Sequence, residues 1–294
     1  MKKRQMIILC FIVLFFAANI TFADINHDLV AYYSFDNYNA NDESGNGYNG
    51  NIIGNVQWED GKNGSAISFN GTDSFIELPD PGEYTEATVG GWIKWQKFNK
   101  WSRFFDFGKF EAAFHVGNVE NTNKLFYDLE FIDETNVVIN FNLIEGEWYH
   151  IMLIVSNNSG AKLYLNGQLV SESPHLTESF NNLSDDSKFY LGKSNWEVDL
   201  LFNGVIDEFR IYNRSLTKTE IQELYNQWGN TCSCTDSDGD GVIDQWDECS
   251  DTKAGSAVYS NGCASIKGDM DNSDSLGLED SIGILQVLTG LRND

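Results

Sequence analysis

The residues whose types and spacing point most directly to chemistry lie between positions 236 and 247, in the run Asp-Ser-Asp-Gly-Asp-Gly-Val-Ile-Asp-Gln-Trp-Asp. Carboxylates occupy positions 1, 3, 5, 9 and 12 of this run, and a glycine at position 6 permits a sharp turn. Calcium takes about six to eight oxygen ligands, which alternate side chains of a curling loop and one main-chain carbonyl can supply. The sequence therefore predicts a calcium site formed by Asp236, Asp238, Asp240, Val242, Asp244 and Asp247.

A second acidic loop follows at 269–280. Its oxygen-bearing side chains stand at positions 1, 3, 5 and 12 of the loop and are Asp269, Asp271, Ser273 and Asp280. The next residues predict a helix, because Ile282, Leu285 and Leu288 share one helical face. Two interpretations stay open: a second calcium loop, or a solvated acidic cap near the N-terminus of that helix, where carboxylates are favourable.

Both loops resemble known calcium modules. With Cys249 after it, the first loop is similar to a thrombospondin type 3 repeat, whose loops have the form DxDxDGxxDxxDxC. The second is similar to one loop-and-helix half of a dockerin module, with Asp274 in place of the turn glycine. These resemblances imply calcium as the cofactor and a possible protein partner for the C-terminal region, although the second dockerin copy that cohesin docking uses is missing.

Four cysteines lie in the same acidic region: Cys232, Cys234, Cys249 and Cys263. An even, clustered set in an exported chain predicts two disulfides. A zinc site is the alternative, which is disfavoured because no histidine lies nearby and the interleaved residues are hard oxygen donors. The pairing of the four stays open.

The body of the chain that precedes these loops is predicted to be all-β. Short alternating apolar runs occur at 88–95, 103–107, 137–141, 149–155, 162–165 and 188–191, with Asn-Gly and Asn-Ser-Gly turns between several of them. Strand after strand without a long helical pattern predicts a two-sheet antiparallel sandwich.

The segment from Gly204 to Asn226 closes this body. Simple alternation places Val205, Asp207, Phe209 and Ile211 on one side of a strand and Ile206, Glu208, Arg210 and Tyr212 on the other. Ser215 or Thr217 can then cap a short helix, whose apolar stripe is Leu216, Ile221, Leu224 and Tyr225.

This closing segment resembles the end of the laminin-G-like, concanavalin A-like jelly-roll family, which has the form G-x-IDE-x-RIYNR-x-L followed by a short helix. Family-like motifs stand upstream in the expected order, among them 29–36, the turn at 42–50, 68–71, 89–93, 146–151 and 163–169. The resemblance covers about residues 28–228 and implies a jelly roll. It also implies a structural calcium held by Asp207 and Asp36 at one sheet edge; the alternative is that Asp207 only pairs with a nearby Arg or Lys.

Residues 1–23 are predicted to be an export signal, because a basic start at 2–4 precedes an apolar run at 7–18 and a small-residue cleavage site at 21–23. A retained membrane anchor is the alternative. The predicted organisation is thus a signal peptide at 1–23, the jelly roll at 24–228, a thrombospondin type 3-like segment at 229–265 and a dockerin-like half at 266–294. We expect the protein to be secreted or held at the cell surface, with no membrane insertion after signal removal.

The charge of the chain restricts its partners. It has 19 basic and 44 acidic residues, a formal net charge of −25. Such a surface repels nucleic acid and anionic membranes and attracts divalent cations. We therefore expect no nucleic-acid partner.

Catalysis is not predicted. The acidic run at 128–134 approaches the E-x-D-x-x-E strand motif of concanavalin A-like glycosidases but begins with the wrong carboxylate and lacks the register. None of the four histidines has a nucleophile motif around it, and His150 is expected to be a strand residue with a satisfied hydrogen bond.

Binding is predicted instead. The segment from Trp95 to Trp101 places three aromatic rings where the chain leaves a strand, and Trp101 is the candidate sugar contact; Trp92 and Trp148 are expected in the core. The predicted function is an exported, non-catalytic, calcium-binding protein whose jelly roll recognises a glycan or another extracellular surface ligand. Two alternatives stay open: a polysaccharide-active hydrolase or lyase, and a structural or assembly subunit attached through the acidic C-terminal region.

Overall fold

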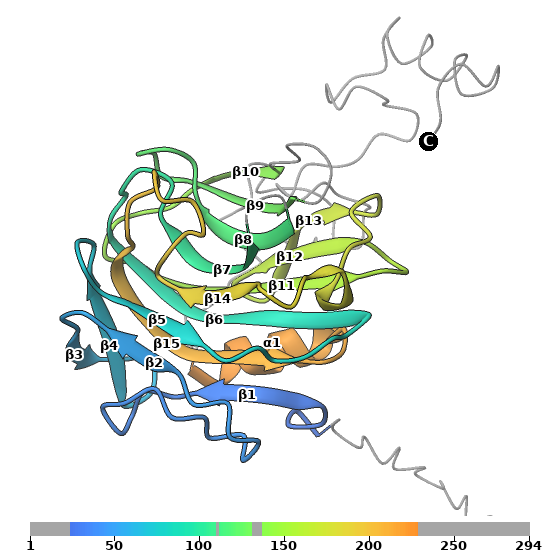
Figure 1. Cartoon of the computed structure of the whole chain (residues 1–294), viewed down its shortest axis with the longest axis horizontal. Coiled ribbons are helices and arrows are strands. Elements are labelled where there is room, and N and C mark those ends of the chain that lie inside the picture. Colours follow the sequence, from blue (N-terminus) through green and yellow to red (C-terminus); the bar gives the residue numbers. More distant parts are fainter. Residues whose placement is uncertain (1–23, 110–111, 131–136, 229–294) are drawn as a thin grey trace, which may run out of the picture.

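The computed structural model describes residues 24–109, 112–130 and 137–228, which form two antiparallel sheets and one α-helix (Figure 1). The eight-stranded sheet runs in the order β13 (Gln168–Ser173), β12 (Ala161–Leu165), β11 (Trp148–Ser156), β6 (Glu86–Lys97), β15 (Asn203–Tyr212), β4 (Ser65–Asn70) and β3 (Gln57–Asp60), and β1 (Leu29–Tyr33) also pairs with β15. The seven-stranded sheet runs in the order β10 (Val137–Asn142), β9 (Lys124–Glu130), β8 (Ala112–Asn118), β7 (Arg103–Lys109), β14 (Lys188–Leu191), β5 (Phe75–Leu78) and β2 (Asn51–Ile53). The predicted all-β sandwich is confirmed.

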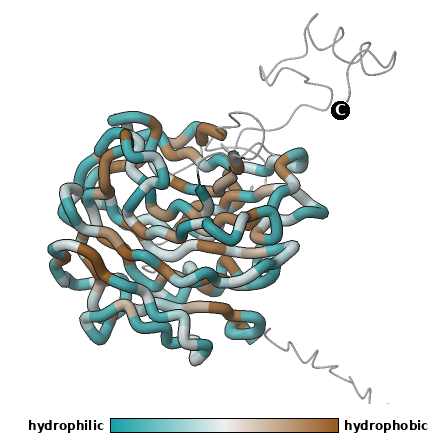
Figure 2. Tube along the Cα trace, in the orientation of Figure 1, coloured by the Kyte–Doolittle hydropathy of each residue, from teal (hydrophilic) through white to brown (hydrophobic). Residues whose placement is uncertain are grey.

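The core lies between the two sheets and is dense in aromatic rings. Phe105 and Phe107 of β7 pack against Phe209 of β15, with ring centroids 5.9 and 6.3 Å apart. Burial of large apolar side chains like these is the main favourable term in folding, worth roughly 1.5–3 kcal/mol for each. Figure 2 colours the chain by hydropathy and shows that hydrophilic residues are concentrated in the peripheral loops.

The last strand departs from simple alternation. Asp207 pairs with Trp92 of β6, but Arg210 pairs with Gly90, so β15 holds one residue more than its partner over this stretch. This β-bulge contains Glu208, whose φ is +53°, and it reverses the facing of the residues after it. The predicted facing was therefore wrong: Ile206 points into the core together with Phe209 and Ile211.

Helix α1 (Lys218–Trp228) covers the outer face of the eight-stranded sheet (Figure 1). Its Ile221 and Leu224 join Met152 and Ile154 of β11 in a second apolar cluster. Thr217 is the residue that caps the helix, because its Oγ1 accepts the Glu220 amide at 3.3 Å while the Thr217 amide donates to Glu220 Oε2 at 2.8 Å. Arg214 holds the same carboxylate at 2.7 and 3.0 Å.

Several predictions fall outside the described residues: the signal peptide at 1–23, the two acidic loops and the four cysteines. Within the part of the chain that the structure describes, no helix is long and apolar enough to cross a bilayer.

Candidate functional site

Four loops meet at one end of the sandwich. They are residues 98–102 between β6 and β7, 119–123 between β8 and β9, 143–147 between β10 and β11, and 192–202 between β14 and β15. Main-chain hydrogen bonds join them: Trp101 N donates to Glu120 O at 2.8 Å, and Leu200 N donates to Lys100 O at 3.0 Å. A main-chain hydrogen bond also joins loop 143–147 to loop 119–123, because Leu143 N donates to Asn123 O at 2.8 Å.

These loops enclose an open hollow of about 620 Å³. Its lining consists of Lys97, Phe98, Asn99, Lys100, Glu120, Asn121, Glu145 and Leu200. The hollow is therefore built by residues from all four loops together with the end of β6. A volume of this size lies within the range of small-molecule binding sites, roughly 300–1,000 Å³.

The lining combines an aromatic ring with paired polar groups. Phe98 is half-buried and stacks on the buried Trp95, with ring centroids 6.2 Å apart and an interplanar angle of 30°. Two asparagines, two lysines and two glutamates surround it, so that hydrogen-bond donors and acceptors face the same space. Such a set suits a ligand with one apolar face and a rim of hydroxyl groups, because the ring can stack and the amides can bond the rim.

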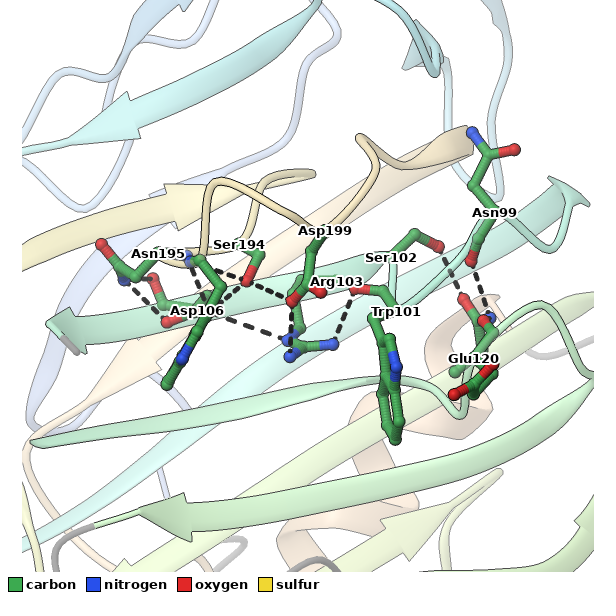
Figure 3. A network of polar contacts seen from close by, with 11 residues as sticks. Asn99, Trp101, Ser102, Arg103, Asp106, Glu120, Ser194, Asn195 and Asp199 are labelled. Atoms are coloured by element: carbon green, nitrogen blue, oxygen red, sulfur yellow. Dashed lines mark hydrogen bonds and ion pairs between the residues drawn. The ribbon is translucent and has the colours of Figure 1, made fainter. Parts of the chain in front are cut away.

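Asn118 holds two of these loops in place. It is fully buried at the end of β8, and its Nδ2 donates to the main-chain oxygens of Asn99, Glu120 and Thr122 at 3.0, 2.6 and 3.2 Å. Its Oδ1 accepts the hydroxyl of Ser102 at 2.6 Å. A single buried amide thus joins loops 98–102 and 119–123, and three of the residues that it contacts, Asn99, Ser102 and Glu120, are labelled in Figure 3.

Arg103 extends this network beneath loop 192–202 (Figure 3). The guanidinium is 5% exposed; it donates to Trp101 O at 2.7 Å and to Asp199 Oδ2 at 3.0 Å. Asp106, which is fully buried, lies 3.7 Å from Arg103 Nε. Asn195 closes the group, donating to the two Asp106 oxygens from its amide N and its side chain at 3.0 and 2.7 Å.

The electrostatics of this network follow from two buried carboxylates sharing one guanidinium. Burial raises the pKa of Asp106, although Arg103 and the hydrogen bonds of Asn195 act in the opposite direction. Burial likewise raises the pKa of Asp199 against the effect of Arg103. His115 of β8 is buried beside them, and burial and Arg103 hold its pKa well below the usual value. The network positions loops and keeps its charges away from solvent.

The aromatic segment 95–101 divides among three environments. Trp95 lies in the core, Phe98 lines the hollow, and Trp101 packs its ring at 81° against Phe126 with centroids 5.2 Å apart. Trp101 has a φ of +51° and is half-buried, and it is not among the residues that line the hollow. Its role as a sugar contact stays a prediction, and Phe98 is the ring that the structure places at the hollow.

The other lining residues were not singled out by sequence reasoning. Glu120 and Asn121 sit in the hairpin loop between β8 and β9, and Glu145 sits in the connection from β10 of one sheet to β11 of the other; neither segment carries a motif. The available signal was topological: in an antiparallel sandwich, every second connection lies at the same end, so loops far apart in sequence share one rim.

The two predicted edge aspartates both bind the turn between β3 and β4. Asp207 Oδ2 accepts the amides of Lys62 and Asn63 at 2.6 and 3.2 Å, and Asp36 Oδ1 accepts the Ser65 amide at 2.9 Å. The close approach needs glycine: a Cβ at Gly61 would lie 2.4 Å from Asp207 Oδ2, and one at Gly64 only 2.0 Å from Asp36 Oδ1. The turn therefore joins the start of the body to its last strand.

One carboxylate oxygen of Asp207, Oδ1, has no hydrogen-bond partner among the described residues. The residue is fully buried. Burial, with a smaller contribution from the Glu208 carboxylate, raises the pKa of Asp207 to about 8 against the effect of the bound amides. A buried carboxylate oxygen without a partner is costly unless a proton or a cation neutralises it.

Glu208, by contrast, is fully satisfied. Its carboxylate accepts the Tyr32 hydroxyl at 2.6 Å, Asn63 Nδ2 at 3.1 Å and Arg210 Nη2 at 2.8 Å. Arg210 therefore pairs with Glu208 and not with Asp207. The Lys62 ammonium, which lies 4.4 Å from the centroid of the Trp92 ring, is the cation that acts electrostatically on the Asp207 carboxylate. Within 24–109, 112–130 and 137–228, no group of three or more His, Cys, Asp or Glu side chains gathers as a metal site.

His150 corrects a further expectation. It lies in β11 and is 2% exposed, as predicted for a strand residue, but its Nδ1 is buried without a hydrogen-bond partner among the described residues. The ring packs against Trp92 at 5.1 Å instead, and burial lowers its pKa to about 3. His150 is therefore a neutral packing residue.

Comparison with known proteins places these features in a family. Residues 70–222, just over half of the chain, match the family described as the concanavalin A-like lectin/glucanases superfamily. Paraclostridial mosquitocidal protein 1 of Paraclostridium bifermentans is 23% identical in an alignment 214 residues long that covers 65% of this chain and 17% of that protein. The chain thus spans less than a fifth of the length of this curated relative.

Many solved structures are similar to this chain. Domain 4 of AbnA, a GH43 extracellular arabinanase from Geobacillus stearothermophilus solved with arabinotriose, aligns with a TM-score of 0.56 at 27% identity, over 67% of this chain and 98% of that domain. The binding domain of the mosquitocidal protein aligns at 0.53 and 20% identity, over 70% of this chain and 53% of that structure.

The third structure belongs to botulinum neurotoxin type C, whose cell entry depends on two ganglioside molecules; it aligns at 0.56 and 16% identity, over 71% of this chain and 53% of that structure. The latter two likenesses show the fold alone. The family match over 70–222 agrees with the observed fold, a two-sheet sandwich closed by β15 and α1. The chain belongs to the concanavalin A-like lectin/glucanases superfamily.

Proposed function

We propose that this protein recognises carbohydrate, without cleaving it, through the hollow at the loop end of its jelly roll. The observation that carries the proposal is the lining itself: one half-buried aromatic ring, Phe98, stands among amide, ammonium and carboxylate groups on loops that Asn118 fixes. A preformed site with a stacking ring and convergent polar groups is what sugar binding requires, because little ordering is left to be done on binding.

The similarity to the AbnA domain supports the same class of ligand. That domain was solved with arabinotriose and aligns over nearly its whole length, 98%. Its likeness to this chain at 27% identity makes arabinotriose a rational first probe.

The test is calorimetric titration of the full chain with arabinotriose, followed by a glycan array. Phe98→Ala is expected to weaken binding at least about tenfold, which is about 1.4 kcal/mol. Phe75→Ala is the matched control, since Phe75 is a half-buried phenylalanine on β5 that packs on Tyr190 and does not line the hollow. Silence of the whole array with folded protein would refute the proposal, and loss of binding in Phe75→Ala alone would move the site to the outer face of the seven-stranded sheet.

Calcium is part of the proposal. The orphaned Oδ1 of Asp207 suits an oxygen-liganded cation, with Asp36 beside the same turn. Such an ion would bind the folded chain and not the unfolded one and would stabilise the closing strand. The acidic loops at 236–247 and 269–280 are proposed as further calcium sites, the first in a thrombospondin type 3-like segment and the second in a dockerin-like half.

Terbium luminescence can isolate the edge site. Trp92 is the cross-strand neighbour of Asp207 and would sensitise an ion bound there. Because Trp246 lies in the first acidic loop, the comparison must be made between the parent chain and Asp207→Asn, both carrying Trp246→Phe. Equal luminescence in the two would exclude a metal at Asp207.

We propose further that the protein is exported, with residues 1–23 as its signal and disulfides among Cys232, Cys234, Cys249 and Cys263. The acidic region after residue 228 would then serve as a calcium-stiffened spacer or attachment segment. Mass spectrometry of the non-reduced protein from the culture medium of an expressing host tests both parts: the expected result is a chain beginning near residue 24 with no free thiol.

A further inference from the structure

The hollow carries no net charge. Lys97 and Lys100 are balanced by Glu120 and Glu145, and the remaining lining residues are neutral. None of the lining residues is a histidine, so the side chain that usually titrates near neutral pH is absent from this lining. A charged ligand would find no surplus of opposite charge here.

The surroundings are strongly negative. Residues 24–228 contain 13 basic and 31 acidic side chains, so the jelly roll itself repels anions even without the acidic C-terminal region. Two lysines are therefore too few to turn this end into an anion-binding surface. Loop 192–202 adds one exposed carboxylate, Glu197, and one ammonium, Lys193, so it does not give this end a surplus of positive charge.

The polar groups of the hollow match hydroxyl groups instead. A carboxylate accepts two hydrogen bonds from neighbouring hydroxyls, while an ammonium or a side-chain amide donates to their oxygens. Phe98 and the half-exposed Leu200 supply the apolar side against which a sugar ring can lie. Every group in the lining can be used by a neutral polyol.

We infer that the ligand is a neutral oligosaccharide, and that glycans bearing sialic or uronic acids are discriminated against by Glu120 and Glu145. This inference rests on the proposed function and narrows it. The discrimination comes from repulsion at two defined carboxylates, which is how specificity is commonly imposed against a close competitor.

The test compares arabinotriose with a sialylated trisaccharide on the full-length protein. Arabinotriose is expected to bind at least tenfold more tightly, with an affinity that changes less than twofold between 50 and 500 mM salt because no net charge is paired. Glu120→Gln and Glu145→Gln should each raise the affinity for the sialylated sugar about threefold at low salt. Glu147→Gln is the matched control, because this exposed glutamate lies in the same loop but does not line the hollow.

The outcomes separate the two proposals. Tighter binding of the sialylated sugar by the parent chain would overturn the neutral-ligand inference and leave carbohydrate recognition standing. Equal gains in Glu147→Gln and Glu145→Gln would overturn the assignment of discrimination to the hollow. Absence of binding to either sugar and to every glycan of the array would overturn both proposals.

Discussion

Two buried carboxylates, Asp106 and Asp207, are accommodated in opposite ways in this sandwich. Asp106 lies under loop 192–202, where Asn195 occupies both of its oxygens and Arg103 stands 3.7 Å away. Asp207 lies in the bulge of β15, where two main-chain amides share one oxygen and the other has no partner among the described residues. Both side chains are fully buried, and burial raises the pKa of both.

The difference teaches what each region needs. The network around Asp106 is closed, since its cation and donors come from the chain itself, and it serves to fix the loops of the hollow. In the Asp207 region one carboxylate oxygen has no partner among the described residues. The stability of this region therefore depends on a proton or a metal ion from solution. Removing a partner of Asp106 should therefore lower the free energy of unfolding, whereas adding a metal ion at Asp207 should raise it.

The largest effect is expected from breaking the closed network. Arg103→Met would leave Asp106 and Asp199 buried without their shared cation, and should cost about 3–5 kcal/mol of unfolding free energy at pH 7. Urea denaturation followed by tryptophan fluorescence measures this. Lys109→Met is the control, because its partner Asp186 is exposed and their ion pair should contribute little. Equal stability of the two variants would show that the Arg103 network does not hold this end together.

A smaller effect is expected from the Asp207 region. Calcium at about one hundred times its dissociation constant should stabilise the parent chain by about 2.7 kcal/mol per site. Asp207→Asn should lose the part of this gain that comes from the edge site, while in chelator it should be no less stable than the parent, because the orphaned charge is gone. Thermal melting with calcium and with chelator measures the calcium-dependent gain and the effect of the unpartnered charge separately. If calcium stabilised Asp207→Asn as much as the parent chain, Asp207 would not be a calcium ligand.

The smallest effect concerns a third carboxylate, Glu220, which is buried like Asp106 and Asp207 but is partnered by Arg214 and by the helix cap. Arg214 and the Thr217 cap lower the pKa of Glu220 from 4.5 to about 2. A lowered pKa means that the unfolded chain binds the proton first, so this stabilisation is complete above pH 4.5 and is lost as the pH falls towards 2. We expect a loss of about 1–2 kcal/mol of unfolding free energy, because solvent at the partly exposed Arg214 screens the ion pair.

Glu220→Gln should lack this component, which differential calorimetry between pH 5 and 2 can detect. Glu223→Gln, on the same helix but outside the cap, is its control. A pH profile of Glu220→Gln identical to that of the parent would contradict the assignment.

Much of the fold was predictable because its signals are local. Alternation located strands such as β11 and β14, and Ser215 and Thr217 were the two predicted caps of α1, of which Thr217 is the one the structure uses. The bulge of β15 was not predictable from alternation, since it depends on Glu208 adopting a positive φ to meet Tyr32, Asn63 and Arg210, which lie in three different segments. One extra residue then inverted the expected facing of the strand's second half.

The candidate site was less predictable than the fold. Sequence reasoning found the aromatic segment but favoured Trp101, because ring size is visible in a sequence and strand exit geometry is not. Phe98 was placed at the hollow by its stacking on Trp95, and Glu145 by the turn between β10 and β11. Asp207 was found through a family resemblance, and its unsatisfied oxygen became visible only with the surrounding packing.

The pairing of β1 with β15 has a mechanical consequence. Leu29 lies opposite Tyr212, and Arg214 bonds the carbonyl of His27, so the two ends of the described body are joined at one seam. Tension applied between these ends would load that seam and would bypass the four loops at the rim. A body fastened in this way could keep hold of a sugar while its connecting chain is pulled.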